Sequence, residues 1–308
     1  MFILPNNVTI IEVGPRDGLQ IEKKHVNEND KLAFIEALQG SGIQEMELTS
    51  FVSPKWVPQM ADAKTIVEKS KKVGRQFVLA PNDKGAELAI EAGATSIAVF
   101  VGVSNTFNIK NINRTTAESI DALQPVFARL KINGIFIRAC ISTAFYCPYE
   151  GKIEIEDVVA LCKRFVAMGA DELSVADTIG KANPRESYEL FKTLKEEFPD
   201  VLLTAHFHDT RKMAIANIFA ALQAGINRFD TSAGGLGGCP FAPGATGNVA
   251  TEDVVNMLDM LGIETGVDVK KVCQAVQVIA PHVSGPIDTG MYRLFENDPA
   301  VRSWLRLC

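Results

Sequence analysis

The sequence predicts an α/β protein folded as a (β/α)8 TIM barrel with additional C-terminal helices. An apolar strand followed by an amphipathic helix recurs eight times along the 308 residues, the pattern of repeated strand–helix modules. Several helices end at a glycine just before the next strand, and unusual polar residues gather directly after strands. A doubly wound open sheet is the lesser alternative, because it has the same alternation. We expect one catalytic domain over 1–308, with the barrel at about 8–265 and a helical extension at about 266–308.

The eight expected strands are short apolar or β-branched runs. They lie at residues 8–13, 45–48, 77–80, 96–101, 134–141, 172–176, 202–207 and 228–231. The helices that follow show helical spacing of apolar residues, and they lie at 29–38, 61–72, 84–92, 117–130, 155–168, 185–198, 212–224 and 251–261. Left-handed helix caps are expected at Gly42, Gly93, Gly169 and Gly225. A polar loop is expected from the fourth strand through Arg114. Segments 269–280 and 290–307 are expected to be helices that pack on the barrel or form a subunit contact.

Composition excludes several classes of function. Hydrophobic residues make up 47% of the chain, enough for a large core, and the net charge of −6 argues against nucleic acid as a partner. The six cysteines form no CxxC pair, so we expect reduced thiols in a cytoplasmic protein. The N-terminal residues do not resemble a signal peptide, and no apolar run is long enough to span a membrane.

In a TIM barrel the active site lies in the loops after the strands. The candidate residues follow five of the expected strands: Arg16 and Asp17 after the first, Glu47 at the end of the second, Asp177 after the sixth, His206 and His208 at the end of the seventh, and Cys239 and Asn248 after the eighth. The first, second, seventh and eighth strands are neighbours in a closed barrel. These groups are therefore expected to converge.

A divalent metal site is the first expectation from these residues. Residues i and i+2 of a strand project from one face, so His206 and His208 can point at one ion. Together with the Asp17 carboxylate and the Asn248 carbonyl they form a mixed oxygen and nitrogen set, which suits Mg²⁺ or Mn²⁺ better than Zn²⁺, with Fe²⁺ as a further alternative. Such an ion polarises a hydroxyl and a carbonyl, and Arg16 beside it could stabilise an enolate. These parts suit chemistry at a C–C bond next to a carbonyl.

Structural roles are the alternatives for the same residues. Arg16 and Asp17 could form a loop ion pair, and Glu47 could be a buried acid paired with an arginine. Asp177 could cap a helix, and Cys239 could be a small core residue. The functional interpretation depends on the joint placement of these residues at one rim.

At these residues the chain resembles the 3-hydroxy-3-methylglutaryl-CoA lyases, in a superfamily of metal-dependent TIM-barrel enzymes that includes isopropylmalate and citramalate synthases. The resemblance covers about residues 8–269. The motifs that carry it are EVGPRDGLQ (12–20), TSFVSPKWVPQM (49–60), KNIN (110–113), CPYEGK (147–152), DTIG (177–180), HFHDT (206–210) and GGLGGCPFAPGATGNVATED (234–253). The cysteine loop in the last motif separates the lyases from the synthases.

The resemblance implies a retro-Claisen cleavage of 3-hydroxy-3-methylglutaryl-CoA to acetyl-CoA and acetoacetate. The implied Mg²⁺ or Mn²⁺ ligands are Asp17, His206, His208 and Asn248. Arg16 would neutralise the thioester enolate, and Glu47 would hold Arg16 or the substrate. Asp177 would assist the substrate hydroxyl, and Cys239 would transfer a proton. His206 would serve catalysis as well as metal binding. Lys23 and Asn82 would contact the CoA phosphates or pantetheine. A homodimer is also implied, for which Leu294, Trp304 and Leu305 are apolar candidates, whereas Cys308 is expected to be an exposed thiol.

Three segments depart from the family pattern at the rim of the expected barrel. Arg211-Lys212-Met213 lacks a glycine that often follows HFHDT, Phe145-Tyr146 precedes the CP loop, and residues 104–108 read SNTFN. A lyase for a longer branched 3-hydroxyglutaryl-CoA is therefore the nearest alternative. A Claisen-type synthase for an acyl-CoA and a 2-oxo acid, and a non-catalytic CoA-binding protein, are further alternatives.

Overall fold

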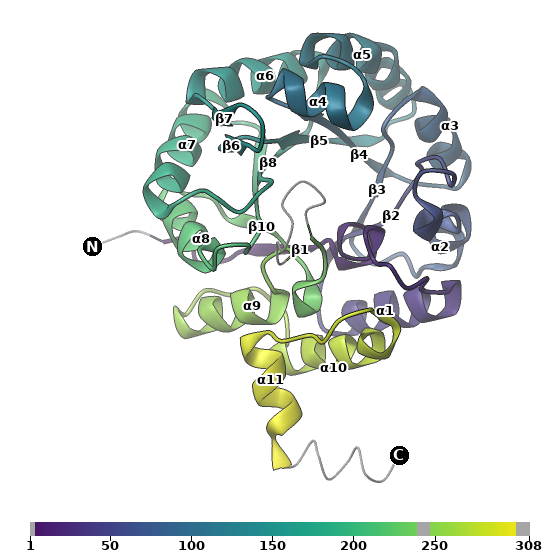
Figure 1. Cartoon of the computed structure of the whole chain (residues 1–308), viewed down its shortest axis with the longest axis vertical. Helices are drawn as coiled ribbons and strands as arrows, with labels where there is room; N and C mark the ends of the chain where they lie inside the picture. The colour runs from purple at the N-terminus through teal and green to yellow at the C-terminus, as the bar shows by residue number, and fades with distance from the viewer. Residues whose placement is uncertain (1–3, 239–246, 300–308) are drawn as a thin grey trace.

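The computed structural model describes residues 4–238 and 247–299, and their main strands close into a barrel of parallel strands (Figure 1). The order around the barrel is β1-β10-β9-β8-β5-β4-β3-β2. Their bounds are β1 Thr9–Glu12, β2 Glu45–Ser50, β3 Arg75–Leu79, β4 Ser96–Gly102, β5 Phe136–Ser142, β8 Glu172–Asp177, β9 Leu202–Phe207 and β10 Arg228–Thr231. The pairing of β1 with both β2 and β10 confirms the predicted TIM barrel and excludes the open sheet.

Helices surround the strands and continue beyond the eighth unit. Those of the barrel are α1 Glu28–Gly40, α2 Ala63–Lys69, α3 Asp83–Glu91, α4 Asn105–Ile112, α5 Thr116–Ile132, α6 Ile155–Met168, α7 Pro184–Glu197, α8 Ala214–Gln223 and α9 Thr251–Met260. The extension contains α10 Val269–Ile279 and α11 Gly290–Asn297. Short helical turns are η1 Gly14–Gly18, η2 Pro58–Met60, η3 Ala233–Gly235 and η4 Ala280–His282, and β6 Tyr146–Cys147 pairs with β7 Gly151–Lys152.

Local sequence explains where many helices begin and end. The Thr115 side chain accepts a hydrogen bond from the backbone of Glu118, whose carboxylate accepts one back from Thr115, and Asn183 and Glu186 form the same capping box before α7. The four glycines predicted as left-handed caps all have positive φ, between 86° and 102°, and are Gly42, Gly93, Gly169 and Gly225. The positive φ values confirm the left-handed helix caps that the sequence predicted at these four glycines.

The structure corrects two expected loops. The segment after β4 contains α4, which begins where the Ser104 side chain accepts a hydrogen bond from Phe107 N. It was predicted as a loop because the segment is polar and has few apolar residues at helical spacing. The loop after β5 likewise contains the β6–β7 hairpin.

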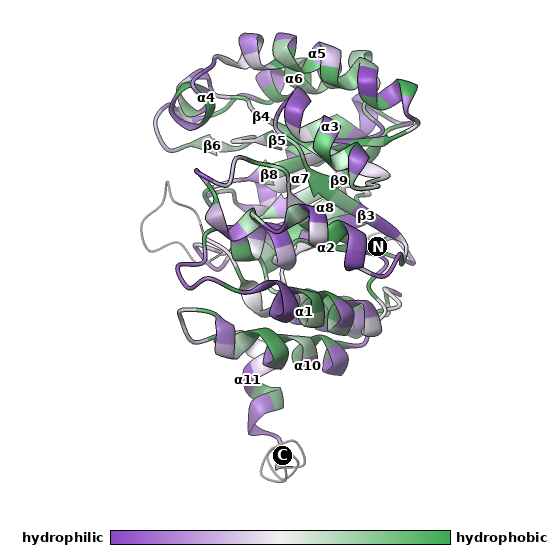
Figure 2. Ribbon diagram, turned by 90° about the vertical axis from the view of Figure 1, so that its right-hand side faces the viewer, coloured by the Kyte–Doolittle hydropathy of each residue, from purple (hydrophilic) through white to green (hydrophobic). Residues whose placement is uncertain are grey.

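The C-terminal extension covers one side of the barrel. Figures 1 and 2 show α10 lying beside α1, with α11 projecting beyond it. Buried side chains of α10, among them Val272 and Val276, join the hydrophobic core. In the part of the chain that the structure describes, α11 covers the first half of the expected 290–307 helix, and none of the helices there is long and apolar enough to cross a membrane.

Charged side chains occupy the interior of the barrel below the rim. Asp230 pairs with Arg138, whose Nε lies 3.4 Å from Glu172 Oε1. Arg228 Nη2 lies 3.4 Å from Glu172 Oε2 and 2.6 Å from Glu45 Oε2. We call these five residues the interior ion chain. It joins β10, β5, β8 and β2 within the barrel, next to a small apolar cluster of Ile11, Val13 and Phe77.

Candidate active site and metal centre

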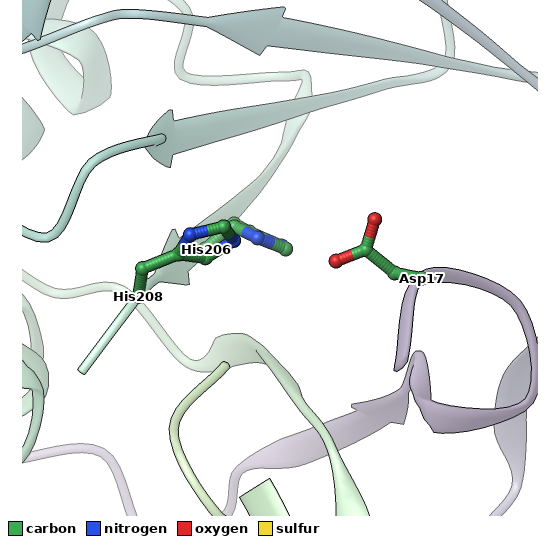
Figure 3. Close-up of side chains that lie close together, drawn as sticks. All are labelled: Asp17, His206 and His208. Carbon is green, nitrogen blue, oxygen red and sulfur yellow. The ribbon is translucent and has the colours of Figure 1, made fainter. Parts of the chain in front are cut away.

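Three predicted metal ligands meet at the C-terminal rim of the barrel. Asp17 lies in η1 after β1, whereas His206 and His208 lie at the end of β9 and directly after it. One potential ligand atom from each residue lies within 4.8 Å of the other two. Figure 3 shows both imidazoles turned toward the Asp17 carboxylate. The structure therefore brings together residues that are almost two hundred positions apart in the sequence.

The two imidazoles lie on the same side of β9, as alternation along a strand requires. Their ring centroids are 5.2 Å apart, with 50° between the ring planes. Burial and the neighbouring His206 lower the pKa of His208 to about 4, so its ring is neutral at physiological pH. Burial also acts to lower the pKa of His206, but Asp230 and Asp17 raise it above its ordinary value.

Asn248 completes the group from the far side of the glycine loop. It forms an isolated antiparallel bridge with His208. Its side-chain nitrogen lies 2.9 Å from Asp17 Oδ2 and 3.1 Å from the Leu236 carbonyl oxygen. The amide NH2 of Asn248 thus contacts Asp17 directly, and the expected role of its carbonyl oxygen as a metal ligand stays a prediction.

These residues fit a divalent cation. His208 Nδ1 is buried and makes no hydrogen bond of good geometry among the described residues. Two imidazole nitrogens and a carboxylate at one point are a donor set for a divalent cation. A cation would satisfy the buried imidazole and balance the Asp17 charge.

Arg16 lies beside this group, held between two carboxylates. Its Nη2 is 2.6 Å from Glu47 Oε2, and its Nη1 is 2.8 Å from Asp17 Oδ1. Burial acts to lower the pKa of Arg16, but Glu47 and Asp17 raise it above its ordinary value, so the guanidinium stays charged. The expected loop ion pair of Arg16 and Asp17 is therefore present, and Glu47 is the buried acid paired with Arg16.

The two carboxylates respond differently to this arginine. Burial raises the pKa of Glu47 above its ordinary value, and Arg16 and Arg138 only partly offset this effect. Burial acts in the same direction on Asp17, but Arg16 and the two histidines lower the pKa of Asp17 overall. Asp17 is therefore ionised at neutral pH, as a metal ligand must be.

Asp177 lies at the end of β8, but its carboxylate is engaged by its own loop. Oδ1 accepts a hydrogen bond from Lys181 N at 3.0 Å, and Oδ2 accepts one from Ala182 N at 2.9 Å. Burial nevertheless raises the pKa of Asp177 to about 6, because these two bonds only partly favour the charged form. Asp177 thus holds its own loop, whereas the cap of the following helix α7 is Asn183, and a catalytic role stays a prediction.

The two predicted CoA contacts lie apart. Lys23 and Asn248 both line a cleft of about 820 Å³, which is also lined by the segment leading to α11. Asn82 instead caps α3, where its side-chain oxygen accepts a hydrogen bond from Gly85 N at 2.9 Å. Asn82 is not among the residues that line this cleft.

Other predictions fall outside the described residues. These are Cys239 in the glycine loop and Trp304, Leu305 and Cys308 at the C-terminus. Leu294 is described: it lies on α11 with 64% of its surface exposed.

Sequence reasoning did not identify the residues beneath His206. Asp230 Oδ2 lies 3.1 Å from His206 Nδ1 and 2.9 Å from Ser174 Oγ, and Asp230 Oδ1 accepts a hydrogen bond from Arg138. The signal available was a charged residue inside an apolar strand, as in FIRACIS of β5 and RFDT of β10. Two such charges on strands of one barrel are candidates for an interior pair.

The chain is similar to known proteins over most of its length. A family model described as HMGL-like matches residues 7–279. Hydroxymethylglutaryl-CoA lyase YngG of Bacillus subtilis is 42% identical over 298 residues, which cover 95% of this chain and 99% of that protein. The mitochondrial hydroxymethylglutaryl-CoA lyase of Homo sapiens is 44% identical over 277 residues, covering 89% of this chain and 85% of that protein. The structure of an HMG-CoA lyase from Acenitobacter baumannii in complex with coenzyme A and 3-methylmalate is 34% identical, with a TM-score of 0.90 and coverage of 97% of this chain and 98% of that one.

Proposed function

The chain belongs to the HMGL-like family, and from this membership we propose that it cleaves 3-hydroxy-3-methylglutaryl-CoA to acetyl-CoA and acetoacetate. The reaction is a carbon–carbon lyase reaction of the retro-Claisen type. Relatives named hydroxymethylglutaryl-CoA lyases at 42% and 44% identity support this activity, as does the likeness to a lyase structure with coenzyme A and 3-methylmalate.

One observation carries the proposal within this chain. Asp17, His206 and His208 offer ligand atoms within 4.8 Å of one another, and the Arg16 guanidinium lies 2.8 Å from the same aspartate. A metal-binding group and a fixed positive charge thus stand together at the active-site rim of a TIM barrel. This combination suits a reaction that generates an enolate oxygen next to a hydroxyl group.

The proposed cation is Mg²⁺ or Mn²⁺, held by Asp17, His206, His208 and Asn248. When bound, it would polarise the tertiary hydroxyl and an adjacent oxygen of the substrate. Arg16 would stabilise the negative charge that develops on the thioester oxygen as the C–C bond breaks. Glu47 fixes the guanidinium from the opposite side, so Arg16 would need little reorganisation during the reaction.

Proton transfer is assigned to Cys239, with Asp177 as a supporting acid. A thiol can protonate the acetyl-CoA enolate if its pKa is near neutral. The pKa of about 6 at Asp177 supports a group that exchanges protons near physiological pH. Its two backbone hydrogen bonds favour a role in shaping the loop that faces the substrate hydroxyl.

Coenzyme A would bind along the cleft lined by Lys23. The ammonium group of Lys23 offers a point charge for a phosphate, and the same cleft is lined by Asn248, which contacts Asp17. A pantetheine arm in this cleft would bring the thioester to Arg16. Asn82 remains a candidate contact for a ligand that extends beyond the cleft.

The central experiment combines purified protein, 3-hydroxy-3-methylglutaryl-CoA and Mg²⁺ or Mn²⁺. Acetyl-CoA and acetoacetate should appear in equal amounts, and no cleavage with either ion would overturn the proposal. A series of 3-alkyl analogues tests the alternative of a longer branched substrate, which would show a higher kcat/KM than the methyl compound. Thiol release from acetyl-CoA plus a 2-oxo acid would instead indicate a synthase.

A matched pair of variants tests whether activity depends on this site. Arg16→Gln should abolish most turnover, because the enolate charge loses its partner. Arg129→Gln makes the same substitution at an arginine on the helical surface, where Arg129 pairs with Asp83. It should leave turnover close to that of the wild type. Equal losses in the two variants would contradict the assignment of Arg16.

Assembly and location are further parts of the proposal. We propose one catalytic domain with a helical extension, assembled as a homodimer in the cytoplasm. The exposed Leu294 on α11 supports a subunit contact, and four free cysteines among the described residues are consistent with a reducing compartment. Light scattering of the purified chain measures the oligomeric state, and a purely monomeric mass would refute the dimer.

A further inference from the structure

The environment of His206 differs from that of His208, although both are buried at one point. His206 Nδ1 faces the Asp230 carboxylate at 3.1 Å, whereas His208 Nδ1 makes no hydrogen bond of good geometry among the described residues. The two imidazoles are therefore held by different means, and only His206 has a carboxylate behind it.

Asp230 is itself held on both oxygens. Oδ1 accepts a hydrogen bond from Arg138, and Oδ2 accepts one from Ser174 Oγ at 2.9 Å as well as facing His206. Only 4% of Asp230 is exposed, and only 1% of Arg138. A buried carboxylate fixed by an arginine and a hydroxyl cannot turn away from the imidazole without losing these partners.

This geometry determines which nitrogen of His206 can bind a ligand. An ionised carboxylate only accepts hydrogen bonds, so the proton of the neutral ring belongs on Nδ1. Nε2 then carries the lone pair, and it is the nitrogen available to a cation shared with Asp17. Buried carboxylates behind metal-binding histidines orient the ring and increase its basicity in many metal sites.

We propose that Asp230 is a positioning residue that fixes His206 as an Nε2 ligand of the metal site, with Arg138 and Ser174 holding Asp230 in place. This inference rests on the proposed metal-dependent function and extends it below the rim. It assigns a function to Asp230, the member of the interior ion chain that contacts His206, which is to orient this ligand. The rest of that chain does not contact the ligands.

The interior ion chain contains a second buried acid, Glu172, that serves as a matched control for Asp230. Glu172 is as buried as Asp230 and pairs with the same Arg138, but it contacts Thr204 and Arg228 rather than a histidine. Asp230→Asn and Glu172→Gln therefore both remove one charge from a shared buried network. Only the first removes the carboxylate that faces His206 Nδ1.

The test is a Mn²⁺ titration followed by electron paramagnetic resonance of the free ion, on folded wild-type, Asp230→Asn and Glu172→Gln protein. Asp230→Asn should weaken Mn²⁺ binding about 10- to 100-fold, and Glu172→Gln should change it less than threefold, judged against the range for supporting carboxylates. Unchanged affinity in Asp230→Asn, or equal losses in both variants, would overturn the proposal. If the wild type binds no Mn²⁺, the proposed metal-dependent function fails instead.

A second measurement does not require a variant to fold. The chain has four histidines, so long-range ¹H–¹⁵N correlation spectra of the metal-free wild type can resolve each ring. At a pH where the ring is neutral, His206 should carry its proton on Nδ1. A proton on Nε2 of His206 would overturn the proposal even if every variant were unstable.

Discussion

Glu47 Oε2 lies 2.6 Å from Arg16 Nη2, and Asp17, a candidate metal ligand, lies 2.8 Å from the other terminal nitrogen of the same guanidinium. Glu47 is almost completely buried, whereas 13% of the Arg16 side chain remains accessible. Arg16 is thus fixed by a buried carboxylate while part of its own side chain stays accessible.

Glu47→Gln should lower kcat about 10- to 100-fold, because a charge-assisted hydrogen bond that orients Arg16 contributes roughly 1.5–3 kcal/mol. Glu45→Gln is the matched control, since Glu45 lies on the same strand but pairs with Arg228 away from the site. Steady-state kinetics, corrected for the folded fraction, should show a near-normal kcat for Glu45→Gln. Similar losses would mean that the contact of Glu47 with Arg16 has no special role in turnover.

Cys239→Ser should lower turnover by orders of magnitude, because a hydroxyl is a far weaker general acid than a thiol. Cys162→Ser should change turnover little. Cys162 is buried in α6, and burial raises the pKa of its thiol to about 12, so it is not available for proton transfer near pH 7. The same assay measures both variants, and equal losses would remove any special role from Cys239.

The proposed metal should stabilise the folded protein. After removal of metal with a chelator, Mn²⁺ at 100 times its Kd should add about 2.7 kcal/mol to the free energy of unfolding and raise Tm. Asp17→Asn should abolish most of this increase, because the ionised ligand is lost. Asp121→Asn, which changes an exposed partner of Arg164, should keep the full increase. Calorimetry with and without Mn²⁺ decides between these outcomes.

Glu12 should make stability fall as pH rises. Its carboxylate accepts hydrogen bonds from Gly14 N, Ala233 N and Thr251 Oγ1, yet burial raises its pKa from 4.5 to about 7. Between these values the folded protein binds more protons than the unfolded chain, so stability decreases as pH rises from 4.5 through 7.

Glu12→Gln should remove this contribution. Relative to the wild type, the variant should gain roughly 1–3 kcal/mol in unfolding free energy between pH 4.5 and pH 8. Urea unfolding at both pH values measures the difference. A gap between wild type and variant that is the same at both pH values would contradict the raised pKa of Glu12.

Lys212 should be replaceable by glycine at little cost. It follows Arg211 directly after HFHDT, and its φ is +57°. A left-handed backbone costs an L-residue about 1–2 kcal/mol, and β-branched residues tolerate it least. The order of stability in thermal unfolding should therefore be Lys212→Gly at or above the wild type, with Lys212→Val clearly below both. A Lys212→Val protein as stable as Lys212→Gly would contradict this account.

Much of the fold follows from signals that are local in the sequence. Each expected strand is a short apolar run, and each of the four predicted glycine caps has a positive φ in the structure. Helix α4 was missed because its polar sequence gives little amphipathic signal, and its start depends on one cap at Ser104. Local patterns thus predict the repeated modules well and the irregular insertions poorly.

The site divides in a similar way. The pairing of His206 with His208 was predictable because residues two positions apart on a strand project from the same face. The approach of Asp17 was predictable because barrel closure places β1 next to β10, with only that strand between β1 and β9. The contact of Arg138 with Asp230 joins residues 92 positions apart across the barrel interior. A charge inside a strand marks each residue as unusual, but no local pattern says which charge on another strand it pairs with. The two hydrogen bonds of Asp177 depend on the exact path of one loop, which its composition does not specify.

The interior ion chain also limits how this barrel can change by stepwise substitution. Removing one member of a buried ion pair leaves an uncompensated charge and typically costs 3–5 kcal/mol, a large share of the stability of a typical protein. Replacing a whole group of such charges by apolar residues of similar volume can be neutral or stabilising. Sequences with an apolar barrel interior are therefore separated from this one by unstable single-step intermediates. A redesign of the interior would have to exchange Arg138, Glu172, Arg228 and Glu45 together, and find another partner for Asp230.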